Sequence, residues 1–313
     1  GVGYMHSDIG GFTGGGQDNE LYARWQQFGA FQPIQRAHGV GVPPEPIFYP
    51  NNIKTIVRDF AKLRMRLLPY NYTLAWENSQ TGLPLVRPLF MEMDGFSSLY
   101  SQVNDQFLWG PNLLVAPVMT AGQTARPVIL PPGRWFDWWT DQPLNGGTTI
   151  NASAPLNRMP LYVRGDAFVP MAPVTNTTAQ YNTDSLEIHY YPADSSKTAQ
   201  FTLFMDDGES RNSLATNQFR TMTFTGRHGQ AGGAQLWVQM TQQGSFAGEP
   251  SMRQLYHHIH RYVVLSGAQV FAVTGNIHAP LQAALSLTDF NSRDSVYWYD
   301  ATRQLLHVKY TID

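Results

Sequence analysis

The sequence predicts an α/β segment followed by an all-β region, and three observations support this fold class. Residues 1–90 read as strand, helix, long helix and strand, which is the order of a parallel α/β structure. From Asn112 onward, short β-like runs alternate with turn signals, and the period-two alternation of a strand is clear in Gln200–Phe204. A parallel barrel needs eight strands, so a β/α piece with only about two is too small to fold alone.

We therefore expect the C-terminal part of a (β/α)8 TIM barrel followed by two β-sandwich domains. The barrel part is predicted at residues 1–110, the proximal sandwich at 111–180 and the distal sandwich at 181–313. The earlier barrel strands are expected upstream of Gly1, because a barrel needs eight. The absence of an initiator methionine indicates that the sequence is cut or processed.

The opening stretch is the part of the chain that we expect to carry function. Its first run, GVGYMHSD, has the composition of a short buried strand, with Val2, Tyr4 and Met5 as apolar side chains, and it ends on Asp8. Side chains at the carboxyl ends of parallel strands face the ligand in α/β proteins. Four side chains are therefore expected around one pocket: Asp8, Phe12, Arg36 and His38.

A short helix is predicted after the glycine-rich loop that follows this run. Asp18 is a candidate N-cap for a helix over residues 20–28. Leu21, Trp25 and Phe28 recur at the helical period, so they are expected to form its apolar face.

A longer helix and a second strand complete the α/β segment. Apolar residues follow the helical period over residues 53–68. Pro69 should end or kink that helix, because proline lacks an amide hydrogen and clashes with the preceding turn. The run 85–90 then reads as a short buried strand.

Composition and charge exclude several classes of protein. The net charge is -2 and there is no basic run, which argues against a nucleic-acid partner. No apolar run has the length of a membrane-spanning helix, so no membrane partner is expected. The chain has no cysteine, which excludes disulfides and thiol chemistry. Aromatic residues make up 13% of the chain, which fits sugar binding and large sandwich cores equally well.

Several long runs resemble glycoside hydrolase family 31. They are SDIGGF (7–12), ELYARWQQFGAFQPIQRAH (20–38), RMRLLPYNYTLAWENSQTGLPLVRPLF (64–90), DQFLWGPNLLVAPVM (105–119), LPPGRWFDWWT (130–140), VRGDAFVPM (163–171) and FMDDGESRN (204–212). The resemblance extends from residue 1 to about residue 225, and its motifs are long and ordered.

The resemblance implies a retaining, exo-acting α-glycosidase that acts on α-glucosides without a cofactor. Such enzymes use two carboxylates, one as nucleophile and one as acid/base. In this family both are aspartates on earlier barrel strands, and neither motif occurs in this chain. The implied partners are an α-linked oligosaccharide substrate and the upstream part of the same enzyme. The implied location is the periplasm or the outside of the cell.

The resemblance also implies roles for the four pocket residues. His38 corresponds to the histidine that hydrogen-bonds sugar hydroxyls in the -1 subsite, and Phe12 to the aromatic side chain beside that sugar. Asp8 matches the aspartate at the end of strand seven. Arg36 matches the arginine two residues before the histidine, and we expect it to be buried and paired with a carboxylate.

Three alternatives stay open at this point. An α-xylosidase and an α-glucosyltransferase (transglycosylase) of the same family differ mainly in regions upstream of this sequence. A non-catalytic carbohydrate-binding β-sandwich protein belongs to another class. It would need no barrel strand, so residues 1–90 argue against it.

The histidines near residue 258 have the spacing of metal ligands. His258 and His260 would share a face of an extended strand, next to His257. No acidic residue is close to them in the sequence. The pattern therefore favours a histidine-rich strand edge, and no metal site is expected.

Overall fold

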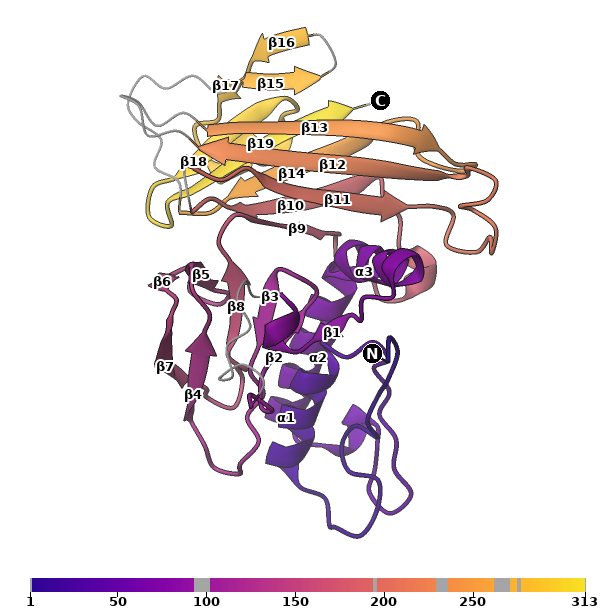
Figure 1. Ribbon diagram of the computed structural model, residues 1–313, viewed down its shortest axis with the longest axis vertical. Coiled ribbons are helices and arrows are strands. Elements are labelled where there is room, and N and C mark those ends of the chain that lie inside the picture. Colours follow the sequence, from indigo (N-terminus) through magenta and orange to yellow (C-terminus); the bar gives the residue numbers. More distant parts are fainter. Residues whose placement is uncertain are drawn as a thin grey trace. The chain divides into compact units, whose positions relative to one another are not determined.

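The structure is a computed structural model that describes residues 2–92, 102–193, 196–228, 236–261, 271–274 and 277–312 of the chain. The chain divides into two compact units. The first unit contains residues 1–65 and 74–164, and the second contains residues 66–73 and 165–313. Figure 1 labels most of the helices and strands of both.

The helices lie mainly in the N-terminal part of the chain. They are α1 (Asn19–Gly29), α2 (Asn51–Arg66), α3 (Leu68–Thr81) and α5 (Leu287–Ser292), with the 3-10 turns η1 (Pro46–Phe48), η2 (Leu89–Met91) and η3 (Thr178–Gln180). Within the described residues, no helix combines the length and the apolar character that are needed to cross a bilayer.

Local signals in the sequence explain where these helices begin and end. Asp18 caps α1, because its Oδ1 accepts a hydrogen bond of 2.9 Å from the Leu21 amide. α2 ends at Arg66 and α3 begins at Leu68, so the predicted break near Pro69 is confirmed. Pro69 lies in the first turn of α3, where a missing amide hydrogen costs no helical hydrogen bond.

The predicted apolar face of α1 is wrong. Leu21 is 47% exposed, whereas Tyr22 and Ala23 are fully buried. The buried face also includes Gln27, which is only 1% exposed and whose Nε2 donates a hydrogen bond of 2.7 Å to Leu156 O. The helix is therefore rotated from the expected orientation, because it also buries polar side chains that hydrogen-bond to neighbouring loops.

The first unit contains a six-stranded sheet and a separate strand pair. The sheet has the order β1-β2-β3-β8-β5-β6, and β4 pairs with β7. Its strands are β1 (Val86–Arg87), β2 (Phe107–Trp109), β3 (Leu113–Val115), β8 (Leu161–Arg164), β5 (Arg134–Asp137), β6 (Pro143–Asn145), β4 (Ala125–Leu130) and β7 (Thr148–Ser153). The pairings are antiparallel.

One hydrophobic core joins the sheet to the strand pair. Leu114 and Trp135 of the sheet and Val128 of β4 belong to the same buried cluster. Helix α1 reaches this region through Phe28, whose ring centroid lies 5.9 Å from that of Phe107. The burial of these apolar surfaces is what stabilises the sandwich.

Arg24 of α1 is held inside the first unit by backbone carbonyls. Its guanidinium donates to Gln123 O (2.9 Å), Ala154 O (2.8 Å), Pro155 O (3.1 Å) and Arg158 O (3.1 Å). The residue is 7% exposed and its Nε lies 3.7 Å from Glu20 Oε1, as the i, i+4 spacing predicts. A buried cation is tolerated here because four backbone carbonyls accept from its Nη1 and Nη2 atoms, although within the described residues its Nε has no hydrogen-bond partner.

The second unit contains a six-stranded sheet, a three-stranded sheet and a strand pair. The six-stranded sheet has the order β17-β18-β19-β14-β10-β9, the three-stranded sheet has the order β11-β12-β13, and β15 pairs with β16. The strands of this unit are β9 (Ala167–Met171), β10 (Ser185–Tyr191), β11 (Ala199–Met205), β12 (Phe219–His228), β13 (Leu236–Ser245), β14 (Arg253–Ile259), β15 (Phe271–Thr274), β16 (Ile277–Pro280), β17 (Gln282–Ala283), β18 (Val296–Asp300) and β19 (Leu305–Ile312).

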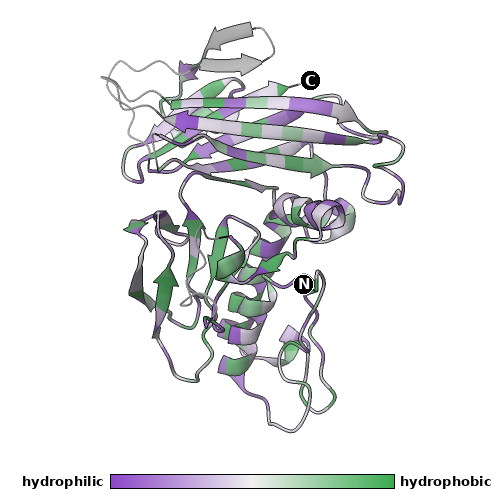
Figure 2. Ribbon diagram, viewed as in Figure 1, coloured by the Kyte–Doolittle hydropathy of each residue, from purple (hydrophilic) through white to green (hydrophobic). Residues whose placement is uncertain are grey.

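These two sheets pack face to face through aromatic side chains. Phe168 of β9 stacks on Tyr190 of β10, with ring centroids 4.3 Å apart, and lies 6.1 Å from Phe224 of β12. Gly226 leaves room for them, because a Cβ there would come within 2.6 Å of the Tyr190 ring. The outer face of β13 is mostly exposed, and Figure 2 shows hydrophilic residues interleaved along this strand.

Two predicted strands differ from the structure. The opening run is not a buried strand: Val2 is 66% exposed and Met5 is 56% exposed, and only Ile9 makes a bridge, to Ala37. Within the described residues no second strand pairs with this run, so its apolar side chains stay at least half exposed. The run 85–90 forms only the two-residue strand β1 before it turns into η2.

Candidate functional site

A parallel bridge between two loop segments builds the candidate site. Ile9 bridges Ala37, and the bridge is closed by hydrogen bonds from Ile9 N to Arg36 O and from His38 N to Ile9 O, both 3.3 Å long. The side chain of Ile9 is fully buried and anchors the pair. Asp8 and His38 therefore lie next to each other, one on each of the two bridged segments.

Two glycines after Ile9 turn the chain back over the site. Gly10 has a φ of 102° and Gly11 a φ of 95°, which other residues rarely adopt. A Cβ on Gly10 would also come within 2.8 Å of the Tyr22 ring. The turn lets Phe12 O accept a hydrogen bond of 2.8 Å from Val40 N, which brings Phe12 next to the second segment.

Asp8, Phe12 and His38 form one cluster. His38 Nδ1 lies 3.0 Å from Asp8 Oδ1, and the side chains are 35% and 36% exposed respectively. The Phe12 ring centroid lies 5.1 Å from that of His38, at an angle of 38°. Phe12 is itself 39% exposed. The cluster thus presents a carboxylate, an imidazole and an aromatic face at one surface.

The hydrogen bonding of the Asp8–His38 pair leaves polar atoms available to a ligand. If His38 Nδ1 donates to Asp8, the neutral ring presents Nε2 as an acceptor. Within the described residues, neither this Nε2 nor the second Asp8 oxygen has a partner. Both atoms can accept hydrogen bonds from hydroxyl groups, while the aromatic face of Phe12 can pack on an apolar surface.

Ser7 supports this cluster and was not predicted. Its Oγ accepts a hydrogen bond of 2.7 Å from Trp25 Nε1 and donates one of 3.2 Å to Gln32 Oε1. This fixes the residue that precedes Asp8. The only signal in the sequence was its position next to Asp8, because the link to Trp25 and Gln32 depends on the fold.

Arg36 lies beside the cluster and contributes to it through its backbone. Its carbonyl oxygen accepts the hydrogen bond from Ile9 N at the bridge between Ile9 and Ala37. Its side chain is exposed, and within the described residues it forms no ion pair or side-chain hydrogen bond. The expected ion pair with a carboxylate stays a prediction.

Comparison with protein families gives two matches. A family model described as "Glycosyl hydrolases family 31 TIM-barrel domain" matches residues 1–74. A second, described as "Glycosyl hydrolase family 31 C-terminal domain", matches residues 82–169. All four predicted site residues lie within the first match.

Individual proteins agree with these matches. The chain is 33% identical over 213 residues to an "Alpha-xylosidase" of Saccharolobus solfataricus, covering 66% of this chain and 29% of that protein. It is 35% identical over 212 residues to "Alpha-glucosidase 2" of Bacillus thermoamyloliquefaciens, covering 67% and 26%. A solved GH31 dextranase of Flavobacterium johnsoniae, complexed with glucose, superposes with a TM-score of 0.82 at 27% identity and covers 94% of this chain and 36% of that chain.

The chain thus spans about 26–29% of the length of these two curated relatives. The matches bear out the predicted fold class, the C-terminal part of a TIM barrel followed by β-sandwich domains.

Proposed function

The chain belongs to glycosyl hydrolase family 31, and on that premise we propose that it is the C-terminal part of a retaining, exo-acting α-glycosidase that hydrolyses α-glucosides. The observation that carries the proposal is the Asp8–His38 pair, 3.0 Å apart and beside Phe12, in the part that matches the barrel. The upstream part of the enzyme and an α-linked oligosaccharide are the proposed partners.

The proposed chemistry divides the work between this chain and the upstream part. Two upstream aspartates break the bond: one attacks the anomeric carbon, and the other protonates the leaving oxygen and then activates water. This chain forms one wall of the -1 subsite. Asp8 and His38 accept hydrogen bonds from sugar hydroxyls, and the ring of Phe12 packs against the sugar. Arg36 contributes its backbone carbonyl, which positions Ile9 and hence Asp8.

Substrate turnover by the full-length protein tests this function. An aryl α-glucoside should be hydrolysed, and the first sugar released should have the α configuration, as proton NMR of the anomeric hydrogen can follow. A first product of β configuration would contradict the retaining mechanism. Residues 1–313 alone should give no turnover, and clear turnover by this segment would contradict the upstream location of the carboxylate pair.

The α-xylosidase alternative is favoured by one observation, the 33% identity to a named α-xylosidase. An aryl α-xyloside, which lacks the exocyclic hydroxymethyl group, should be run beside the glucoside. A higher kcat/KM on the xyloside would replace the glucosidase proposal. Transfer to an added sugar acceptor, seen as a new oligosaccharide, would favour the transglycosylase. The periplasmic or extracellular location and the domain boundaries at residues 110 and 180 stay predictions.

A further inference from the structure

The outer face of the six-stranded sheet in the second unit carries a row of histidines. His189 of β10 is the cross-strand partner of His258 of β14, and His258 is the partner of His307 of β19. Glu187 lies two residues before His189, so it is on the same face. β14 lies between β10 and β19, so the expectation of a histidine-rich strand edge is wrong.

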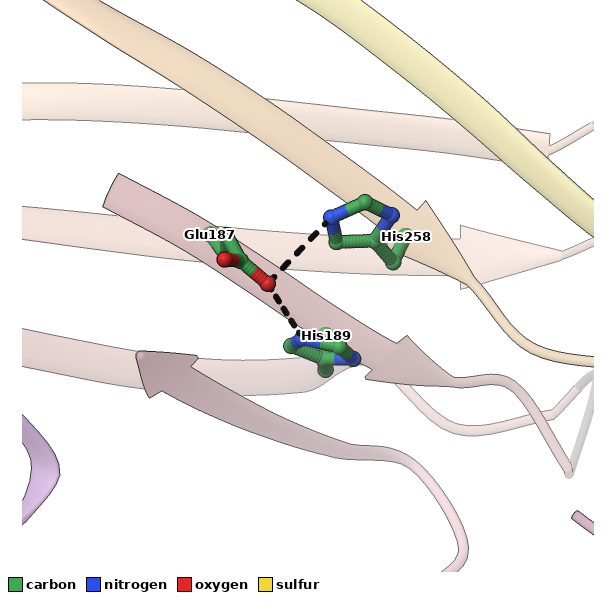
Figure 3. A group of neighbouring side chains, drawn as sticks. All are labelled: Glu187, His189 and His258. Carbon is green, nitrogen blue, oxygen red and sulfur yellow. Dashed lines mark hydrogen bonds and ion pairs between the residues drawn. The ribbon is translucent and has the colours of Figure 1, made fainter. Parts of the chain in front are cut away.

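The strand partners supply the acidic residue that is missing near His258 in the sequence. Glu187 Oε2 lies 3.3 Å from His189 Nε2 and 3.6 Å from His258 Nε2. The ligand atoms of all three side chains lie within 4.8 Å of one another. Figure 3 shows the two imidazoles directed at the same carboxylate oxygen.

The two separations from Glu187 Oε2 are close to those of a metal coordination sphere. Ligand atoms about 2.0–2.2 Å from a tetrahedral zinc ion are about 3.3–3.6 Å apart. The donor set of two imidazole nitrogens and one carboxylate oxygen also suits divalent transition ions. Glu187 is 23% exposed and each of the two histidines 15%, so an ion from solvent can reach the cluster.

The other ring nitrogens of the two histidines are already fixed. His189 Nδ1 lies 2.9 Å from His260 Nε2, and His258 Nδ1 lies 2.8 Å from His307 Nδ1. Metal-binding histidines almost always hydrogen-bond through the nitrogen that does not bind the ion, which sets the tautomer and the ring orientation. Both rings can therefore present Nε2 to an ion without rearrangement of the backbone, provided that the proton of each ring lies on Nδ1.

The protonation states also suit metal binding. Burial lowers the pKa of His189 to about 4, and burial together with neighbouring histidines lowers that of His258 well below its usual value. Both rings are therefore neutral near pH 7. Burial alone would raise the pKa of Glu187, but the hydrogen bond with His189 and the charge of Arg66 lower it overall, so the carboxylate is ionised.

We propose that Glu187, His189 and His258 form a binding site for one divalent ion of the zinc class, with water completing its coordination. The ion would link β10 to β14, two parallel neighbours that are distant in sequence. The proposal does not depend on the proposed glycosidase function, because none of the pocket residues takes part in it.

Arg66 gives the proposal its sharpest consequence. Its Nη2 lies 2.5 Å from Glu187 Oε2, the same oxygen that both imidazoles approach. A guanidinium and a divalent ion repel each other, so binding of the ion must move Arg66 away from this oxygen. Replacement of Arg66 by a neutral residue should therefore strengthen metal binding. If the cluster is only an ion-pair network with Arg66 and binds no metal, the same replacement would instead weaken the cluster.

Zinc binding to the full-length protein, purified without a histidine tag and treated with EDTA, tests the site. Isothermal titration with Zn²⁺ should give one ion per chain and raise the Tm by a few degrees. Co²⁺ should bind in its place and give visible d–d absorption from nitrogen and oxygen ligands. Arg66→Gln should bind Zn²⁺ about tenfold more tightly.

Two histidine variants provide the matched comparison. His258→Gln should abolish zinc binding and the Co²⁺ spectrum. His257→Gln should retain both, because His257 lies on the other face of β14, where its Nε2 is 2.9 Å from Tyr310 Oη. Absence of zinc binding, equal binding by His258→Gln and the wild type, or weaker binding by Arg66→Gln would each overturn the site. If His258→Gln does not fold, the Co²⁺ spectrum of the wild type and the zinc affinity of Arg66→Gln still test the proposed site.

Discussion

Two carboxylate–histidine pairs in this chain have similar separations but different surroundings. In the first unit, Asp8 Oδ1 lies 3.0 Å from His38 Nδ1, on loop segments, with each side chain about one-third exposed. In the second, Glu187 Oε2 lies 3.3 Å from His189 Nε2, on a strand inside a sheet. The same pair of functional groups is thus presented in two environments.

The difference shows that the neighbours of such a pair, and not the pair itself, decide what it can do. Asp8 and His38 leave one acceptor atom each for a ligand, beside the apolar ring of Phe12. Glu187 is already shared with Arg66, and His189 is held on its other side by His260. The first arrangement suits an uncharged polar ligand such as a sugar, whereas the second suits a cation that replaces an internal partner.

The largest expected effect comes from the exposed pair. His38→Ala in the full-length protein should lower kcat/KM for an aryl α-glucoside by on the order of a hundred- to a thousandfold, because hydroxyl contacts strengthen in the transition state. Steady-state kinetics measure it. Arg58→Ala is the control and should leave the rate unchanged. Arg58 is exposed, and its Nε lies 3.6 Å from Oδ1 of Asp59, which is exposed as well. An unchanged rate in His38→Ala would remove His38 from the site.

The second effect concerns stability, and here the pair in the sheet of the second unit should dominate. In the presence of EDTA, Glu187→Gln should lower the free energy of unfolding by about 2 kcal/mol, because Arg66 loses its charged partner. Asp8→Asn should cost less than about 0.5 kcal/mol, because exposed ion pairs contribute little. Urea titrations followed by fluorescence measure both. Equal losses would show that the two environments do not differ as described.

A smaller effect is expected from the residue that supports the first pair. Ser7→Ala leaves the indole N–H of Trp25 without its acceptor, which should cost about 1 kcal/mol of stability. It should also lower kcat/KM a few-fold, since Asp8 is less firmly positioned. Ser79→Ala is the matched control, because that exposed hydroxyl donates to the Trp76 carbonyl and accepts from Gln80 Nε2, both within its own helix. Equal effects of the two substitutions would contradict a supporting role for Ser7.

The smallest effect is expected at Arg36. Arg36→Ala keeps the backbone carbonyl that accepts from Ile9 N, so kcat/KM should change less than about twofold. The same kinetic assay measures it. A large loss would show that the guanidinium reaches the substrate or an upstream carboxylate, as the family resemblance implied.

Features set by neighbouring residues were predicted from the sequence. The capping of α1 by Asp18 and the helix break near Pro69 follow from hydrogen bonding within a few residues. The proximity of Asp8 and His38 was also predicted from the sequence. Each residue lies at the end of a segment, and both segments were expected to line one pocket. Their role in binding stays a prediction.

Features set by pairings between distant residues were not predicted from the sequence. Whether β14 lies at an edge or inside the sheet depends on β10 and β19, which are about 50–70 residues away. The acidic partner of His258 could not be found by looking near it in the sequence. Likewise, the exposure of Val2 and the outward direction of Arg36 depend on which segments pack beside them, which composition does not encode.

The burial of Arg24 has a consequence for engineering. Its four carbonyl acceptors lie at residues 123, 154, 155 and 158, within the match to the C-terminal domain, whereas Arg24 itself lies within the match to the barrel. The boundary between the two family domains is therefore not a boundary between independent pieces. A chimera can take its barrel from one family member and its sandwich from another. It must then keep four backbone carbonyls in place around the same arginine, or take the helix with the arginine and the loops with the carbonyls from the same protein.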